Sequence, residues 1–198
     1  MATRKVFLLS PANSGGPRGA MLLNERATFE LALKLRSCGA AIGEIYSFIS
    51  GLYFRGKVAY STAFAEVDST FVITPGSGLL PPDTIITCEE LRRLAAIDIH
   101  QDEPRFRIPL ERDARHLAQS AEQVILLGSI ATAKYMDPLL ECFGDRLVFP
   151  AEFIGRGDMS RGGLMLRSAQ SKVELEYIPA RGAVRHGRRP PKLPKLTK

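Results

Sequence analysis

The sequence has few residues that could form disulfides or bind a structural metal, and no long apolar run that could anchor it in a membrane. Cysteine occurs only three times in 198 residues, and this odd, widely spaced set contains no CxxC pair. The pattern favours reduced thiols over a disulfide framework. The three histidines form no cluster with metal-ligand spacing, so we expect no metal and no other cofactor. No apolar run is long enough for a transmembrane span or a signal-peptide core, which predicts a cytoplasmic protein with no membrane partner.

Two groups of functional motifs are also missing. The chain contains neither the Walker A pattern nor GxGxxG, and no Ser-His-Asp or Cys-His set can be assigned. No single motif therefore names a substrate or a reaction. The function has to be inferred from the location of the charge and from the predicted fold.

The net charge of +6, from 27 basic and 21 acidic residues, is confined to one end of the chain. Residues 181–198 hold seven basic residues, three prolines and no acid, whereas the rest has a net charge of −1. We therefore expect one domain over residues 1–180 and an extended basic tail over 181–198. The tail either contacts nucleic-acid phosphates or serves for solubility or docking on protein. Its nucleic-acid-binding candidates are Arg185, Arg188, Arg189, Lys192, Lys195 and Lys198.

Short apolar runs alternate with helical segments along the body. The expected strands are Lys5–Ser10, Glu44–Ile49, Thr70–Thr74, Gln123–Leu127, Arg146–Phe149 and Val173–Ile178. The expected helices cover 25–37, 53–64, 87–94 and 109–120, the third beginning with a capping box. This alternation predicts an α/β domain with a mainly parallel sheet and helices on both faces.

Five segments after predicted strands are candidates for a binding site. They are residues 10–19, 50–57, 75–83, 128–135 and 155–163. Ligands of open α/β sheets bind beyond the carboxyl ends of the strands, so in a parallel sheet these segments are expected to share one edge. The ligand-binding candidates are Ser10, Asn13, Tyr53, Arg55, Lys57, Gly78, Ser129, Lys134, Tyr135, Arg156 and Arg161.

Each candidate residue has a chemical reason to bind a ligand or to catalyse, and each also has an alternative, purely structural explanation. Arginines and lysines near a helix start suit phosphate, and a Gly-Ser pair offers N–H groups and a hydroxyl. Asp83 and Asp158 are the two candidate catalytic acids or bases. The alternatives are a turn cap for Asp83, a local ion pair for Asp158, and packed aromatic rings or simple turns for the rest.

Four of these segments together resemble a known superfamily. LLSPANSGG, ISGLYFRGKVAY, TPGSGLLPPDT and LLGSIATAKY are similar in type and spacing to motifs of the YaaA-like peroxide-stress protein superfamily and related uncharacterised domains. The resemblance implies a cytoplasmic α/β or α+β protein that binds DNA in oxidative stress, with a base- or nucleotide-acting ancestry. The residues it carries over are Ser10, Asn13, Tyr53, Gly78, Leu79, Pro82, Asp83 and Tyr135.

Three functions follow as hypotheses. The first is a nucleic-acid-binding protein of the stress-response or DNA-repair type, in which the tail adds phosphate contacts. The second is an enzyme, a hydrolase or transferase that acts on a nucleotide, nucleoside or nucleobase in a pocket at the strand ends. The third is an interaction module whose tail docks on a protein partner. We rank the first slightly above the second.

Overall fold

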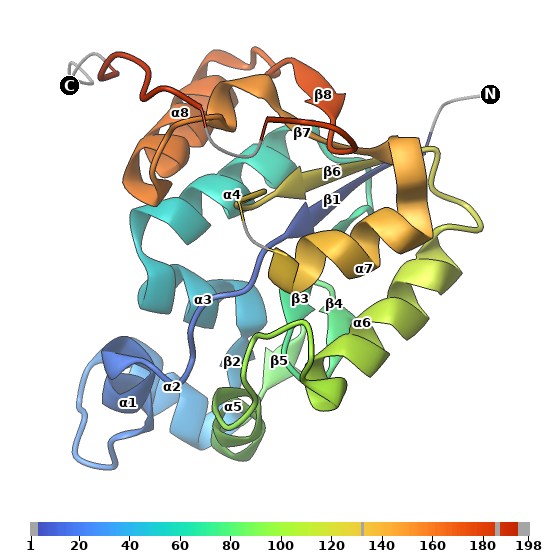
Figure 1. The fold of residues 1–198 in the computed structure, drawn as a ribbon. Coiled ribbons are helices and arrows are strands. Elements are labelled where there is room, and N and C mark those ends of the chain that lie inside the picture. The colour runs from blue at the N-terminus through green and yellow to red at the C-terminus, as the bar shows by residue number, and fades with distance from the viewer. Residues whose placement is uncertain (1–3, 132, 185–186, 194–198) are drawn as a thin grey trace.

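The computed structural model of the protein describes residues 4–131, 133–184 and 187–193. Six strands form one sheet in the order β4-β3-β1-β6-β7-β8 (Figure 1). They are β1 (Lys5–Leu9), β3 (Thr70–Thr74), β4 (Gly78–Leu80), β6 (Gln123–Leu127), β7 (Leu147–Pro150) and β8 (Tyr177–Pro179). The inner four strands run parallel, and the edge strands β4 and β8 run antiparallel to their neighbours. The prediction of an α/β domain with a mainly parallel sheet is confirmed.

The burial of β1 explains why its sequence predicts a strand clearly. β1 pairs in register with β6 from Lys5–Gln123 to Leu9–Leu127, and residues 6–9 of β1 are fully buried. A strand covered on both faces reads as an unbroken apolar run, which is how KVFLL and QVILL were recognised. The carboxyl ends of β1 and β6 therefore lie side by side.

The described residues form eight α-helices. They are α1 (Pro17–Leu23), α2 (Glu30–Cys38), α3 (Ile42–Ser50), α4 (Leu52–Phe64), α5 (Cys88–Ala95), α6 (Pro104–Leu117), α7 (Ala133–Phe143) and α8 (Asp158–Ser171). The capping box predicted for α5 is present, since Thr87 and Glu90 each accept from the other's backbone N–H. None of the helices in these ranges is long and apolar enough to cross a bilayer.

Four expectations about elements were wrong, one of them the strand over Val173–Ile178, of which only Tyr177 and Ile178 belong to β8. Glu44–Ile49 is not a strand but part of α3, whose buried residues Ile42, Ile45 and Tyr46 have helical spacing. The helix expected over 25–37 begins only at Glu30, as α2, and Asn24 follows the end of the separate helix α1 rather than preceding α2 directly. The Gly-rich segment 155–163 is a loop only as far as Gly157, where α8 begins.

Two glycines bring α4 and α8 into backbone contact. A methyl group on Gly56 would lie 2.6 Å from the carbonyl oxygen of Gly162, and one on Gly162 would lie 2.6 Å from that of Leu52. Only glycine fits at both positions, because such distances are far inside van der Waals contact. The crossing fixes the start of α8 against the first turns of α4.

A short ribbon holds the helices that follow β1 to a later part of the chain. β2 (Ala40–Ala41) pairs antiparallel with β5 (Ile85–Ile86). The N–H groups of Ile42 and Gly43 at the start of α3 donate to the carbonyls of Thr84 and Pro82. The segment between β1 and β3 is thereby joined to the segment between β4 and α5.

The described part of the basic tail lies on the body. The Arg156 guanidinium donates to the carbonyl of Pro191 at 3.3 Å, and Leu193 packs against the edge of the core. The exposed basic residues of this part are Arg181, which pairs with Asp145, and Arg188, Arg189 and Lys192. The other nucleic-acid-binding candidates, Arg185, Lys195 and Lys198, lie outside the described residues.

Candidate functional site

A cleft of about 520 Å³ opens at the carboxyl ends of β1 and β6. The chain passes from β1 to β3 on one side and later to β6 on the other, so the strand order reverses here. Such a switch point is where open α/β sheets bind ligands, and the volume lies in the usual range of ligand sites. The cleft is lined by residues of the loop after β1, the α3–α4 junction, the loop after β6 and the start of α8.

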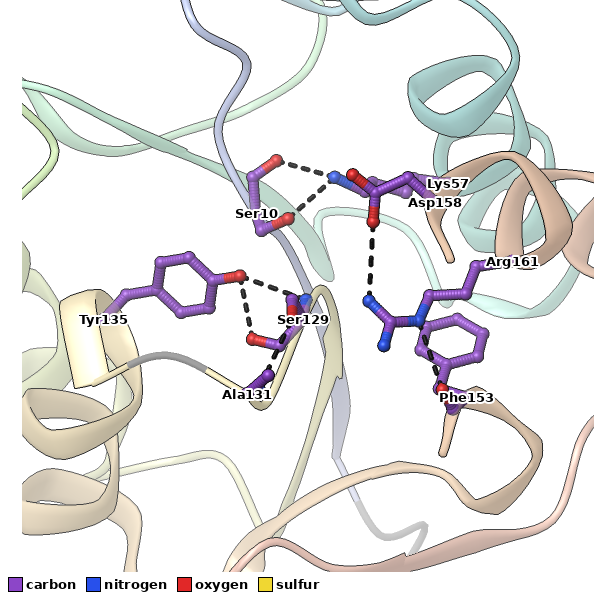
Figure 2. Close-up of polar contacts among 8 residues, drawn as sticks. All are labelled: Ser10, Lys57, Ser129, Ala131, Tyr135, Phe153, Asp158 and Arg161. Atoms are coloured by element: carbon purple, nitrogen blue, oxygen red, sulfur yellow. Dashed lines mark hydrogen bonds and ion pairs between the residues drawn. The ribbon is translucent and has the colours of Figure 1, made fainter. Parts of the chain in front are cut away.

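A buried lysine contacts the loop after β1. The Nζ atom of Lys57 lies 2.7 Å from Ser10 Oγ and 2.9 Å from the Ser10 carbonyl oxygen, and Lys57 is only 1% exposed (Figure 2). The ring of Tyr53, one turn earlier on α4, has its centroid 4.0 Å from the same nitrogen. Ser10, although buried, is part of the cleft wall.

Burial decides the charge of this lysine. Removal from water lowers the pKa of Lys57 to about 7, and the guanidinium of Arg161 acts in the same direction, while the carboxylate of Asp158 opposes it. A lysine in water stays protonated up to about pH 10. Lys57 therefore gains or loses its proton near neutral pH, which is the property required of a general base.

Tyr135 closes the other side of Ser10. Its hydroxyl donates to the carbonyl of Ser129 at 2.9 Å and accepts from the Ser129 N–H at 3.0 Å. A methyl group on Gly128 would lie 2.7 Å from Ser10 Cβ and 3.1 Å from the Tyr135 hydroxyl, so a side chain there would collide with both. Burial raises the pKa of Tyr135, which keeps the phenol protonated. Figure 2 shows Ser10 between Lys57 and Tyr135.

The start of α8 supplies an ion pair beside Lys57. The Arg161 guanidinium donates to Asp158 at 3.4 Å and to the carbonyl of Phe153 at 3.2 Å, and Arg161 is buried while Asp158 is exposed (Figure 2). The nearby hydroxyl of Tyr53 is buried beside the Arg161 guanidinium. Burial raises its pKa as well.

The rim of the cleft is basic. Arg18 and Lys134 line it from the starts of α1 and α7, and Asp158 is the only acidic residue in the described lining. Arg18 is held by a hydrogen bond from its guanidinium to the carbonyl of Phe48 at 2.9 Å. Asn13 lies on the same rim and is exposed. The balance of charge favours an anionic ligand.

The structure brings together some of the predicted site residues. Those in or directly behind the cleft wall are Ser10, Asn13, Tyr53, Lys57, Ser129, Lys134, Tyr135, Asp158 and Arg161. The expectation that sequence-distant loops meet at one edge holds for the segments after β1 and β6.

Four predicted residues lie elsewhere. Asp83 is exposed in the turn before β5, because β4 runs back antiparallel along β3 and carries the chain away from the site edge. Gly78 lies in β4 and touches Asp113 instead. Arg55 is exposed on the face of α4 opposite to Lys57, and Arg156 binds Glu152, Ser160 and the tail.

Arg18, Ile49 and Ile99 are among the cleft-lining residues that were not named as candidates. Arg18 belongs to a predicted loop segment, and its charge was a usable signal. Ile49 and Ile99 line the cleft from the end of α3 and from the connection between α5 and α6. Apolar residues of this kind carry no local signal, because only the tertiary arrangement turns them toward a cleft.

Comparison of the chain with protein-family models, curated proteins and solved structures gives no match. Within residues 4–131, 133–184 and 187–193, no group of three or more His, Cys, Asp or Glu side chains could hold a metal ion. The functional groups at the cleft are two serine hydroxyls, two lysine amines, two guanidinium groups, two phenols and the carboxylate of Asp158.

Proposed function

We propose that the protein is an enzyme, a hydrolase or transferase, that acts on a nucleotide-like anion in the cleft at the ends of β1 and β6. The observation that carries the proposal is the buried Lys57 against Ser10 in the wall of a basic cleft at the switch point of the sheet. A buried amine with a perturbed pKa in a cleft is a mark of functional sites. A structural lysine would not need a place beside an open cavity.

The ligand class is inferred from the lining. Arg18 and Lys134 would bind phosphate oxygens, since cations on a cleft rim bind anions. The rings of Tyr53 and Tyr135, with Ile49 and Ile99, give the apolar walls on which a base or sugar would lie. The proposal includes a cytoplasmic location, an origin in the YaaA-like superfamily and helices on both faces of the sheet.

A binding experiment tests this function. Nucleoside mono-, di- and triphosphates and free nucleosides are titrated against the whole protein by calorimetry. We expect a phosphate-bearing ligand to bind, and Lys134→Ala to weaken it about tenfold or more, the loss of one charged hydrogen bond. Lys34→Ala, which removes an exposed lysine paired with Glu44 outside the cleft, is the control and should bind normally. Absence of binding by every member of the panel contradicts the ligand class.

A second candidate, nucleic-acid binding of the stress-response or DNA-repair type, is favoured by one observation. The exposed Arg188, Arg189 and Lys192 lie on a tail seated beside Gly157, which precedes the cleft residue Asp158. Replacing all three with alanine should lower the slope of log affinity against log salt for duplex DNA by roughly two to three units. An unchanged slope would remove the tail from any such interface.

A further inference from the structure

We infer that Ser10 and Lys57 form a nucleophile–base pair that cleaves an ester or amide bond of the ligand through an acyl-Ser10 intermediate. The inference rests on the proposed function for the place and the ligand class of the cleft. It adds the bond that is broken and the role of each residue. Its chemistry can be tested without a nucleotide.

The first support is the geometry of Lys57 as a neutral amine. Its Nζ donates to the Ser10 carbonyl at 2.9 Å and lies 4.0 Å from the centroid of the Tyr53 ring. Protonated Lys57 donates to Ser10 Oγ at 2.7 Å, and the neutral amine can accept the Ser10 hydroxyl proton over the same distance. A hydroxyl that donates to an adjacent neutral base is an activated nucleophile.

The second support is that the pair is held rigidly. Lys57 lies on α4 one turn after Tyr53 and next to Gly56, where α4 touches the backbone of α8. Ser10 directly follows β1, and its N–H donates to the carbonyl of Leu127 at 3.2 Å. Both atoms are therefore fixed by the backbone of regular elements, and a preorganised pair reacts faster than a mobile one.

The reaction balances without a metal or redox partner. Ser10 Oγ bonds to the acyl carbon of the substrate as its proton passes to Lys57 Nζ, and the carbonyl electrons move to oxygen. The carbonyl then re-forms as the bond to the leaving group breaks, and this group takes the proton from the Lys57 ammonium. Water adds to the acyl-Ser10 ester in the same way, with Lys57 taking the water proton. Breakage of the carbon–Oγ bond releases the carboxylic acid and returns a proton to Ser10.

Asp158 and Arg161 tune the base and are positioning residues. They have opposite effects on Lys57, the carboxylate favouring its protonated form and the guanidinium the neutral one. Neither is in hydrogen-bond contact with Ser10 among the described contacts. Their substitution should therefore move the pH dependence of the reaction without moving the site of covalent modification.

A fluorophosphonate probe tests the pair directly. Activated serines attack its phosphorus and expel fluoride, so the expected result is one adduct, located by peptide mass spectrometry on Ser10. The labelling rate should rise through a midpoint near pH 7, where Lys57 loses its proton. Lys57→Met should slow it by at least about 100-fold, the usual contribution of a general base. Ser61→Ala, a buried serine on the same helix, should label at the normal rate.

Ser10→Cys keeps the inference testable where Ser10→Ala does not fold. The new thiol should react with iodoacetamide faster than Cys38 at pH 7, and Lys57→Met should abolish that advantage. Adducts on another serine, or labelling of Ser10 that is flat between pH 5.5 and 9, would overturn the pair. So would borohydride trapping of a carbonyl compound on Lys57, because the amine would then be the nucleophile.

The two proposals fail separately. Nucleotide binding without labelling of Ser10 overturns the nucleophile–base pair alone. Labelling of Ser10 in a protein that binds no member of the nucleotide panel overturns the ligand class and supports the pair.

Discussion

The contact between α4 and α8 predicts opposite effects for two neighbouring substitutions, Gly162→Ala and Gly163→Ala. At Gly162 the new methyl group would lie 2.6 Å from the Leu52 carbonyl oxygen and 2.8 Å from Tyr53 Cα, and neither atom can move without the helix. At Gly163 it would meet only the ends of two side chains, Arg167 at 3.3 Å and Leu193 at 3.7 Å. The two positions are consecutive in the same helix, so they share the same intrinsic helix propensity.

The magnitudes follow from two terms of opposite sign. Alanine in a helix interior is favoured over glycine by up to about 1 kcal/mol, while overpacking costs about 1–3 kcal/mol. We therefore expect Gly162→Ala to lose roughly 1–2 kcal/mol of unfolding free energy and Gly163→Ala to gain a few tenths. For a chain of this size, 1 kcal/mol corresponds to about 2–4 °C in melting temperature.

Thermal unfolding of the two variants beside the wild type is the assay. Gly162→Ala should melt roughly 2–8 °C below the wild type, and Gly163→Ala at or above it. The same Gly162 variant should label more slowly at Ser10, because separating the helices displaces Lys57. Equal melting temperatures for the two variants would refute the reasoning, since it would mean that the helices do not meet at Gly162.

Three further predictions concern the base, its tuning and a helix cap. Between about pH 7 and 10 the unfolded chain holds a proton on Lys57 that the folded chain lacks. The unfolding free energy of the wild type should therefore rise with pH, relative to that of Lys57→Met, by up to about 1.4 kcal/mol per pH unit. A difference in unfolding free energy between the two proteins that stays constant from about pH 6 to 9 in urea denaturation would contradict this. Asp158→Asn should move the midpoint of Ser10 labelling to lower pH, because the carboxylate raises the pKa of Lys57; a midpoint shifted upward would show that another group sets it. Thr87→Ala should cost about 1 kcal/mol in urea denaturation by removing the hydrogen bond from the Glu90 N–H to the Thr87 hydroxyl, and an unchanged midpoint would show that this bond carries no stability.

The sequence was informative where one physical pattern dominated. Continuous apolar runs identified β1, β3 and β6, and the capping residues identified α5. The run from Glu44 to Ile49 was misread because a short apolar segment can be a buried strand or a buried helix. The helical spacing of Ile42, Ile45 and Tyr46 was the signal that distinguishes them.

The site was only partly predictable, for a topological reason. Ser10 and Ser129 directly follow parallel strands, so their meeting could be expected from the sheet alone. Asp83 follows the same kind of apolar run, but an antiparallel turn reverses the chain before it, and the sequence carries no strong mark of that reversal. Lys57 was identified as a candidate, whereas its contact with Ser10 depends on how α4 crosses β1.

The hydroxyl pair of Tyr60 and Tyr177 has a consequence for the opposite end of the molecule. These hydroxyls lie 2.6 Å apart, Tyr177 donates to Glu174, and Glu174 pairs with Lys5 at the beginning of β1. Helix α4 is therefore fastened to β1 at two points, through Lys57 at one end of the strand and through this chain at the other. Two attachment points restrict sliding and rotation of α4. The alignment of the Lys57 amine with the Ser10 hydroxyl in the cleft therefore also depends on the contacts of Tyr60, Tyr177 and Glu174 near the other end of β1.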